Sequence, residues 1–137
     1  MGKYPMIVLD THTLIWWVTG VGGELTKTVT SAIKRSQAQN GVMISSITAW
    51  EIAMLVDRNR LTLTLELSAW LSLVTRVPGI RFIPVDNHIA VTSVNLPGEF
   101  HEDPADRIIV ATARTFGAPI ATRDRRIRSY EHVKTIW

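Results

Sequence analysis

The stretch that decides the fold is Met6-Ile7-Val8-Leu9-Asp10, in which four consecutive apolar residues end in an acid. A short apolar run without alternation is typical of a parallel strand that is buried on both faces. A helix is predicted almost directly afterwards, over Thr13–Thr19, so the chain passes from strand to helix within a few residues. Asp10 is therefore expected at the carboxyl end of a strand, which is where open α/β sheets bind their ligands.

The same succession of short apolar strand and amphipathic helix recurs along the chain. The predicted strands are Met6–Leu9, Val42–Ser45, Arg81–Val85, Pro119–Ala121 and Val133–Ile136. The predicted helices are Thr13–Thr19, Lys27–Gln39, Ile47–Arg58, Glu66–Arg76, Asn87–Val94 and Pro104–Phe116. This alternation predicts an α/β fold of three layers, with a central, mainly parallel sheet between two layers of helices.

The composition indicates one folded domain over residues 1–137. Apolar residues make up 46% of the sequence and charged residues 20%, a balance that supports a real core and argues against disorder. The absence of cysteine excludes disulfides and thiolate-bound zinc. The apolar stretch Met6–Leu9 is too short for a secretion signal or a membrane span, so we expect a soluble, cytoplasmic protein without membrane attachment.

The basic residues are concentrated toward the C-terminus, and the formal net charge of the chain is +3. Such a rim attracts phosphate backbones without reading their sequence, although a solvated surface that only confers solubility has the same composition. The candidates for contacts with such phosphates are Arg107, Arg123, Arg125 and Arg126. Arg107 could equally pair with a neighbouring acid.

Two acids, Asp10 and Asp124, follow predicted strands. Each could be a metal ligand at the sheet edge, and each could instead cap a helix or turn, which is a very common use of aspartate. Glu51 lies in a segment that is apolar on nearly all sides, together with Trp50, which we expect in the core. A carboxylate in such a helix is costly unless it is paired or bound to a metal ion.

A further pair of acids, Asp103 and Asp106, opens the most regular helix. Asp103 precedes Pro104 and reads as an N-cap followed by a proline in the first turn. Asp106 is three residues further on, where it can take part in capping or point toward the strand ends as a ligand.

Together these acids predict a cation site. Several carboxylates gathered at one sheet edge repel one another strongly unless a cation is bound between them. Oxygen ligands without histidine spacing favour Mg²⁺ or Mn²⁺ over zinc.

Four stretches resemble the PIN-domain proteins, and specifically the VapC toxins among them. The stretches are Leu9-Asp10-Thr11-His12-Thr13-Leu14-Ile15-Trp16-Trp17, Ser45-Ser46-Ile47-Thr48-Ala49-Trp50-Glu51-Ile52, residues 101–113 around Asp103-Pro104-Ala105-Asp106-Arg107, and Ala121-Thr122-Arg123-Asp124. They occur in the order of that family and span nearly the whole chain. The resemblance implies a PIN-like fold, with a five-stranded sheet in the order 3-2-1-4-5.

The resemblance also implies a metal-dependent endoribonuclease that is neutralised by a cognate antitoxin and forms a homodimer. The catalytic and metal-binding acids would be Asp10, Glu51, Asp106 and Asp124, with Thr11 and Thr122 as supporting hydroxyls. Asp106 is chosen over Asp103 because it stands just before the Ile-Ile-Val-Ala run. The expected cofactor is Mg²⁺ or Mn²⁺, which activates water for attack on RNA, and Glu51 either helps to hold it or accepts the proton of that water.

Three other functions compete with this interpretation. A receiver-like signalling domain would need an acidic pair after the first strand and a lysine after the strand Pro119–Ala121, and both are missing. A phosphatase of the haloacid dehalogenase type would need Asp-x-Asp, but position 12 is His12. A catalytically silent PIN-like module that only binds RNA or protein remains open, because the sequence alone does not report activity.

Overall fold

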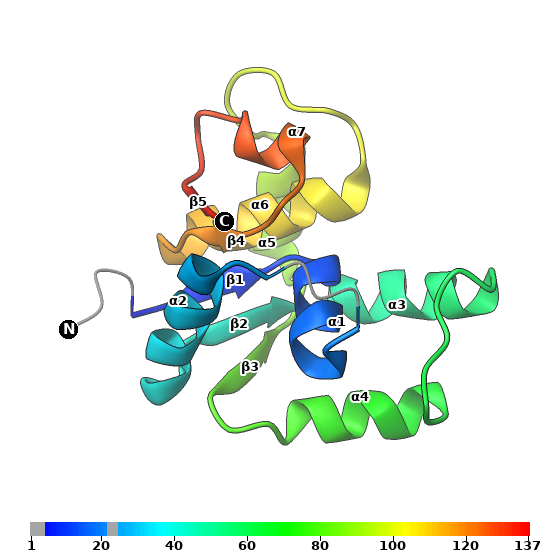
Figure 1. Cartoon of the computed structure of the whole chain (residues 1–137). Helices are drawn as coiled ribbons and strands as arrows, with labels where there is room; N and C mark the ends of the chain where they lie inside the picture. The colour runs from blue at the N-terminus through cyan, green and yellow to red at the C-terminus, as the bar shows by residue number, and fades with distance from the viewer. Residues whose placement is uncertain (1–4, 22–24) are drawn as a thin grey trace.

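The computed structural model describes residues 5–21 and 25–137, which form a central parallel sheet with helices on both faces (Figure 1). The strands are β1 (Ile7–Leu9), β2 (Val42–Ser45), β3 (Ile80–Ile83), β4 (Ile120–Ala121) and β5 (Thr135–Ile136). Their order is β3-β2-β1-β4-β5, and every neighbouring pair is parallel. The predicted α/β fold and strand order are confirmed.

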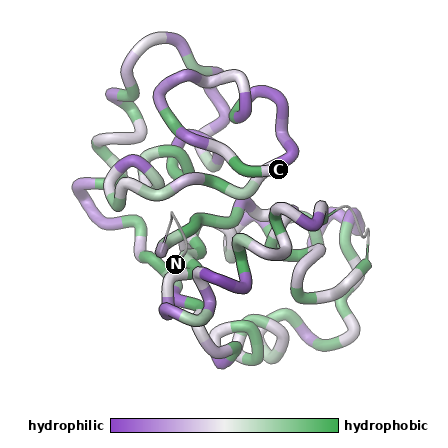
Figure 2. The backbone as a smooth tube through the Cα atoms, turned by 60° about the vertical axis from the view of Figure 1, so that its left-hand side comes forward, coloured by the Kyte–Doolittle hydropathy of each residue, from purple (hydrophilic) through white to green (hydrophobic). Residues whose placement is uncertain are grey.

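The helices cover both faces of this sheet. They are α1 (Thr11–Thr19), α2 (Lys27–Ala38), α3 (Ile47–Asp57), α4 (Leu67–Thr75), α5 (Asn87–Val94), α6 (Pro104–Phe116) and α7 (Arg125–Arg128). Successive strand residues point to opposite faces. Accordingly, Ile7 and Leu9 pack with α1, α2 and α4, whereas Val8 packs with α5 and α6. Hydrophobic and hydrophilic segments alternate along the chain trace, and hydrophilic stretches are prominent in the part near the C-terminus (Figure 2).

The turns from strand to helix are fixed by capping side chains. The carboxylate of Asp10 accepts a hydrogen bond from the backbone N–H of Thr13 at 2.9 Å and so begins α1. Asp103 and Asp124 cap α6 and α7 in the same manner. Asp10 and Asp124 follow parallel strands, which end at one edge of the sheet, so both acids lie at that edge, whereas Asp103 follows the loop after α5.

The structure differs from the predictions by one or two residues at several element ends, and also in one helix and one side chain. The strand predicted at Arg81–Val85 begins one residue earlier and ends two residues earlier, as β3. The helix α7 was not predicted, since four residues are too few to show helical periodicity. Trp50 was expected in the core, but 53% of its surface is exposed, so that expectation is wrong.

Within the described parts of the chain, none of the helices combines the length and the apolar character that a membrane span requires.

Candidate active site

An open pocket of about 330 Å³ lies beyond the carboxyl ends of β1 and β4, where α3 and α6 approach the sheet edge. Its walls carry carboxylates from four separate segments of the chain. The lining residues are Asp10, Thr11, His12, Trp16, Glu51, Asp103, Asp106, Arg123, Asp124 and Arg126. The structure therefore places all four predicted acids, Asp10, Glu51, Asp106 and Asp124, in one cavity.

Asp10 is the most buried of these acids, and neutral donors hold it in place. One carboxylate oxygen accepts the backbone N–H of Thr13, and the other accepts the hydroxyl of Thr122. Burial raises the pKa of Asp10, and the hydrogen bonds from Thr122 and Thr13 counteract only part of that effect. The neutral donors of Thr13 and Thr122 thus orient the side chain without neutralising its charge, which suits a ligand for a cation.

Glu51 is held in a similar way by hydroxyl groups. Its Oε1 accepts the hydroxyl of Thr11 at 2.5 Å, and the Oγ1 atoms of Thr11 and Thr48 are 3.1 Å apart. Since the single proton of Thr11 goes to Glu51, Thr48 donates to Thr11. Burial raises the pKa of Glu51, and the negative charges of Asp103 and Asp10 raise it further. A carboxylate whose pKa is raised is a better proton acceptor than an ordinary glutamate.

Asp106 has a pKa far above that of an ordinary aspartate. Burial and the charges of Asp103, Asp124 and Glu51 raise the pKa of Asp106 to about 7. Its Oδ2 lies 3.6 Å from a terminal guanidinium nitrogen of Arg126, which opposes the shift but does not cancel it. Carboxylates that raise one another's pKa in this way are frequent at functional sites, and a bound cation would relieve their repulsion.

His101 flanks Asp106 from the loop before α6. Its Nδ1 accepts the backbone N–H of Asp103 at 3.4 Å, so the proton of the neutral ring is assigned to Nε2. Nε2 lies 3.0 Å from Oδ2 of Asp106, within ion-pair distance, but this buried atom makes no hydrogen bond to any of the described residues. Burial and the charge of Arg126 lower the pKa of His101.

Asp124 behaves differently from Asp106, although both are in the same pocket. Burial alone would raise the pKa of Asp124, but hydrogen bonds from Arg126 and its charge outweigh burial and lower it. The hydroxyl of Thr122 accepts the backbone N–H of Asp124 at 3.0 Å while it donates to Asp10. Thr122 thereby links the two acids that follow β1 and β4.

The donor set fits a hard divalent cation. Within residues 5–21 and 25–137, no three acidic or histidine side chains converge closely enough to ligate one ion directly. Mg²⁺ commonly keeps several water ligands and takes only one or two carboxylates directly. Asp10 and Asp106 are the carboxylates suited to direct or water-mediated ligation, with Asp124 and Glu51 beside them.

The predicted arginines are not equivalent. Arg123 and Arg126 line the pocket. Arg107 does not, because its guanidinium donates to the backbone carbonyls of Ser93, Val94, Phe100 and His101. Its predicted phosphate contact is therefore corrected to a structural role that ties the loop before α6 to α5. Arg125 is exposed on α7 and is absent from the pocket wall.

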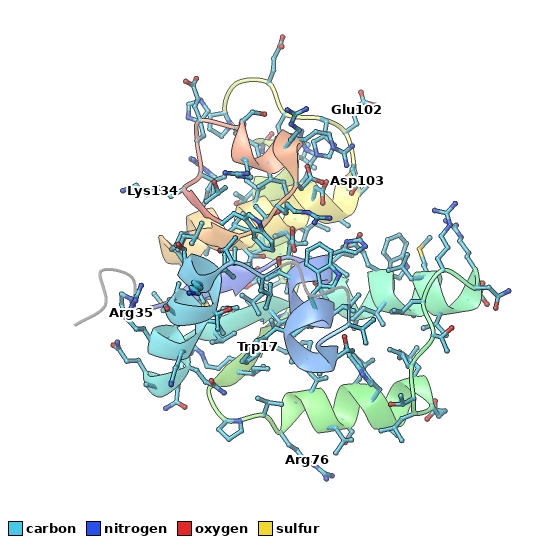
Figure 3. The ribbon with its side chains drawn as sticks, in the orientation of Figure 1. Trp17, Arg35, Arg76, Glu102, Asp103 and Lys134 are labelled. Carbon is cyan, nitrogen blue, oxygen red and sulfur yellow. The ribbon has the colours of Figure 1, made fainter. Side chains whose placement is uncertain are left out.

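The predicted hydroxyls Thr11 and Thr122 both contact the acids, as described above. Asp103 also lines the pocket while it caps α6, where Figure 3 labels it. Site residues that the sequence did not reveal are His12 and Trp16, which line the pocket, and His101, which contacts Asp106. Their only sequence signal was proximity to Asp103 and Asp10 along the chain.

Comparison with known proteins agrees with this architecture. Residues 7–133 match the PIN domain family. The chain belongs to the PIN domain family. It is 32% identical over 133 residues, 96% of this chain and 98% of the relative, to Ribonuclease VapC22 of Mycobacterium tuberculosis. All four stretches that resemble the family lie within the matched residues 7–133.

Solved structures share the PIN-like fold at lower sequence identity. The crystal structure of FitAcB from Neisseria gonorrhoeae is 21% identical, with a TM-score of 0.67, over 96% of this chain and 97% of that chain. The crystal structure of VapBC2 from Rickettsia felis, bound to a DNA fragment from its promoter, has a TM-score of 0.70 at 13% identity, over 96% and 97% of the chains. A toxin–antitoxin complex from Klebsiella pneumoniae has a TM-score of 0.63 at 19% identity, over 96% of each chain.

Proposed function

We propose that this PIN-domain protein is a metal-dependent endoribonuclease of the VapC toxin type, with Mg²⁺ or Mn²⁺ as cofactor. The observation that carries the proposal is the convergence of Asp10, Glu51, Asp106 and Asp124 from four separate segments on one pocket. The pKa of Asp106, raised to about 7 partly by its acidic neighbours, supports a cation there. The relative named Ribonuclease VapC22 supports RNA as the substrate.

The residues of the pocket have distinct tasks in this mechanism. A divalent cation, when bound, lowers the pKa of a water molecule and offsets the charge that develops on the phosphate. Asp10 is pre-oriented by Thr13 and Thr122, so little reorganisation is needed for ligation. Glu51 helps to hold the cation or accepts the proton of the attacking water, and its raised pKa favours the second role.

Substrate positioning falls to the two arginines of the pocket wall. Arg123 and Arg126 are exposed at the rim and can neutralise phosphates on either side of the attacked bond. Single-stranded or looped RNA suits an open pocket because its backbone is accessible. In-line attack by water would leave a 5′-phosphate and a 3′-hydroxyl.

A cognate antitoxin is the proposed protein partner, because the structural relatives include toxin–antitoxin complexes. We expect it to insert a segment into the acidic pocket. A second cavity of about 480 Å³ adjoins that pocket, shares His12 and Trp16 with it, and is lined by apolar residues such as Leu55, Leu61 and Trp70. An apolar segment of the antitoxin could bind in this second cavity, next to the acidic pocket.

We also propose that the protein acts in the cytoplasm as a homodimer. Large apolar side chains are exposed on α3 and α5, with Trp50 at 53%, Val91 at 60% and Val94 at 74%. Exposed apolar surface of this kind is frequent at subunit interfaces. Sedimentation at micromolar concentration should show a dimer, and a purely monomeric protein would contradict this part of the proposal.

The nuclease activity is tested by incubating purified protein with a mixed pool of single-stranded RNA, with Mg²⁺, with Mn²⁺ and with EDTA. We expect cleavage with either metal, none with EDTA, and products that carry 5′-phosphates. A 2′,3′-cyclic phosphate product would exclude the mechanism. No cleavage by folded, antitoxin-free protein would favour a silent PIN-like binding module.

A further inference from the structure

Trp16 is a large aromatic side chain on the wall of the acidic pocket, and the mechanism above gives it no task. It belongs to α1, the helix that Asp10 caps, and it lines the pocket together with the acids. Its side chain is only half-buried, unlike Leu14 and Ile15 before it. Core packing alone therefore does not account for its position.

The indole ring is fixed by its neighbours. The guanidinium carbon of Arg123 lies 4.7 Å from the ring centroid, as in a cation–π pair. His12 and Trp137 contact the ring at centroid distances of 5.8 Å and 6.0 Å, and both rings are inclined to it, by 48° and 62°. Neither ring is stacked parallel on the indole, whereas the guanidinium of Arg123, an exposed residue, lies over its face.

An indole under a guanidinium is a suitable surface for a nucleobase. Unpaired bases stack on aromatic rings and on arginine planes in proteins that bind single-stranded nucleic acid. The pocket beside this surface repels a phosphate backbone, since its carboxylates outnumber its arginines. Stacking supplies an attraction that does not depend on the sign of that charge.

We propose that Trp16 and Arg123 form a stacking platform for the unpaired base next to the phosphate that occupies the acidic pocket. The proposal rests on the proposed function, because it takes RNA to be the substrate. A base within a duplex is already stacked and paired, so the platform would favour single-stranded over double-stranded RNA. Trp16 is then a substrate-binding residue, while the acids carry the reaction.

The test measures binding to RNA without cleavage. Asp106→Asn is the background, and fluorescence anisotropy in Mg²⁺ follows three labelled oligomers of equal length: a single-stranded oligoadenylate, a single-stranded oligouridylate and an abasic ribose-phosphate chain. Trp16→Leu should weaken binding of the two base-bearing oligomers by about 10-fold and leave the abasic chain within about 2-fold. Trp16→Phe, which keeps an aromatic face, should restore most of the affinity.

Matched controls separate stacking from general damage. Trp17→Leu makes the same change at the next position of α1, where the side chain packs against the core and does not line the pocket (Figure 3). Arg123→Lys keeps the charge and removes the planar group, and Arg125→Lys is its counterpart outside the pocket. Thermal unfolding verifies that each variant is folded.

The outcomes distinguish the platform from the nuclease. An equal loss of affinity for abasic and base-bearing chains in Trp16→Leu would overturn the platform, even if the wild-type protein cleaves RNA. Absence of binding to all three oligomers by the folded protein would overturn it as well. Base-dependent binding that Trp16→Leu removes would support the platform, even if no cleavage is ever detected.

Discussion

The two sides of the acidic pocket hold their carboxylates by different means. On one side, Asp10 and Glu51 are held by threonine hydroxyls and one backbone N–H, which are neutral. On the other side, Asp106 and Asp124 face Arg126, a cation whose side chain is 60% exposed. Neutral donors orient a carboxylate without compensating its charge, whereas a mobile surface cation compensates charge without orienting the group strongly.

This comparison assigns different contributions to the two sides. The threonine-held side provides fixed negative charge for a cation. On the arginine-held side, Arg126 offsets part of the negative charge of Asp106 and Asp124. RNA phosphates that attract Arg126 would reduce this compensation. Loss of an orienting hydroxyl on the first side should therefore weaken metal binding, whereas loss of the cation Arg126 on the second side should strengthen it.

The largest effect is expected at Asp10. Asp10→Asn keeps the cap of α1, because asparagine caps about as well as aspartate, but it removes the buried negative charge. We expect metal-dependent cleavage to fall by about 10³-fold, since loss of a metal ligand costs several kcal/mol of transition-state stabilisation. Initial cleavage rates on a labelled single-stranded RNA measure the change.

Asp86→Asn is the matched control for this prediction. Asp86 caps α5 through the backbone N–H of Ile89 at 2.9 Å, and it does not line the pocket. Its substitution should leave cleavage unchanged. Equal losses in the two variants would mean that capping, rather than the charge of Asp10, matters for activity.

Removal of the hydroxyl that links Asp10 to Asp124 should have the next largest effect. Thr122→Val keeps the shape of this fully buried side chain and deletes both hydrogen bonds. Metal affinity should fall by about 10- to 100-fold, as is usual when a group that orients a ligand is lost. Titration calorimetry with Mn²⁺ gives the affinity.

Thr112→Val serves as the control, because Thr112 is also buried but donates to the backbone carbonyl of Ile108 within α6. We expect it to retain the metal affinity of the wild-type protein. A similar loss at both threonines would show that the orientation of Asp10 is not what Thr122 contributes.

A smaller effect should appear in the stability of the metal-free protein. The folded protein binds the proton of Asp106 up to about pH 7, whereas the unfolded chain releases it near 3.8, so the free energy of unfolding should fall as pH rises between these values. Asparagine does not titrate, so Asp106→Asn should remove this pH-dependent fall in the free energy of unfolding. At pH 8 the variant should be more stable by about 1–2 kcal/mol, after allowance for solvent screening, and near pH 4 the difference should vanish.

Asp124→Asn should show the opposite sign. The pKa of Asp124 is lowered in the folded protein, so its ionised form adds stability above its ordinary pKa of 3.8, and that stability is lost as the pH falls. Urea unfolding of both variants across this pH range measures the two effects. A stabilising Asp124→Asn at neutral pH would contradict the distinction between the two acids.

The smallest effect is expected at Arg126. Arg126→Gln removes a cation that lies 3.4 Å from Asp124 and 3.6 Å from Asp106, so metal affinity should increase by about 2- to 5-fold at low salt. Calorimetry with Mn²⁺ at two salt concentrations measures it. Arg125→Gln should change nothing, and a decrease in affinity for Arg126→Gln would refute the assigned roles of the two sides.

Much of the fold follows from sequence patterns, because buried parallel strands are short apolar runs and because helix starts carry capping residues. The helix α7 was missed since its four residues are too few for a periodicity. The exposure of Trp50 could not be predicted, because an apolar helix position has the same appearance whether this chain or a partner covers it.

Asp10 and Asp124 were predictable because they follow strands that end at one sheet edge. Glu51 was predictable because a carboxylate is unusual in an apolar helix, and Asp106 because it lies in the first turn of a regular helix within a stretch that resembles the PIN-domain proteins. The other residues that surround those acids could not be predicted from the sequence. The conformation of the loop before α6 places His101 beside Asp106, and the orientation of α1 about its axis places Trp16 on the pocket wall. Neither can be derived from the sequence pattern. Arg107 counted as a basic residue in the sequence, but its donors are all directed to backbone carbonyls, which only the structure reveals.

The central claim, that the carboxylates of this pocket hold a divalent cation through Asp106, is tested most directly by Mn²⁺ titration of three proteins: wild type, Asp106→Asn and Asp103→Asn. Asparagine at position 103 keeps the cap of α6, so this variant controls for the local fold. We predict that the wild type and Asp103→Asn bind Mn²⁺ and that Asp106→Asn binds at least about 10-fold more weakly. Retention of Mn²⁺ by Asp106→Asn together with its loss in Asp103→Asn, or no binding by the wild type, would contradict the claim.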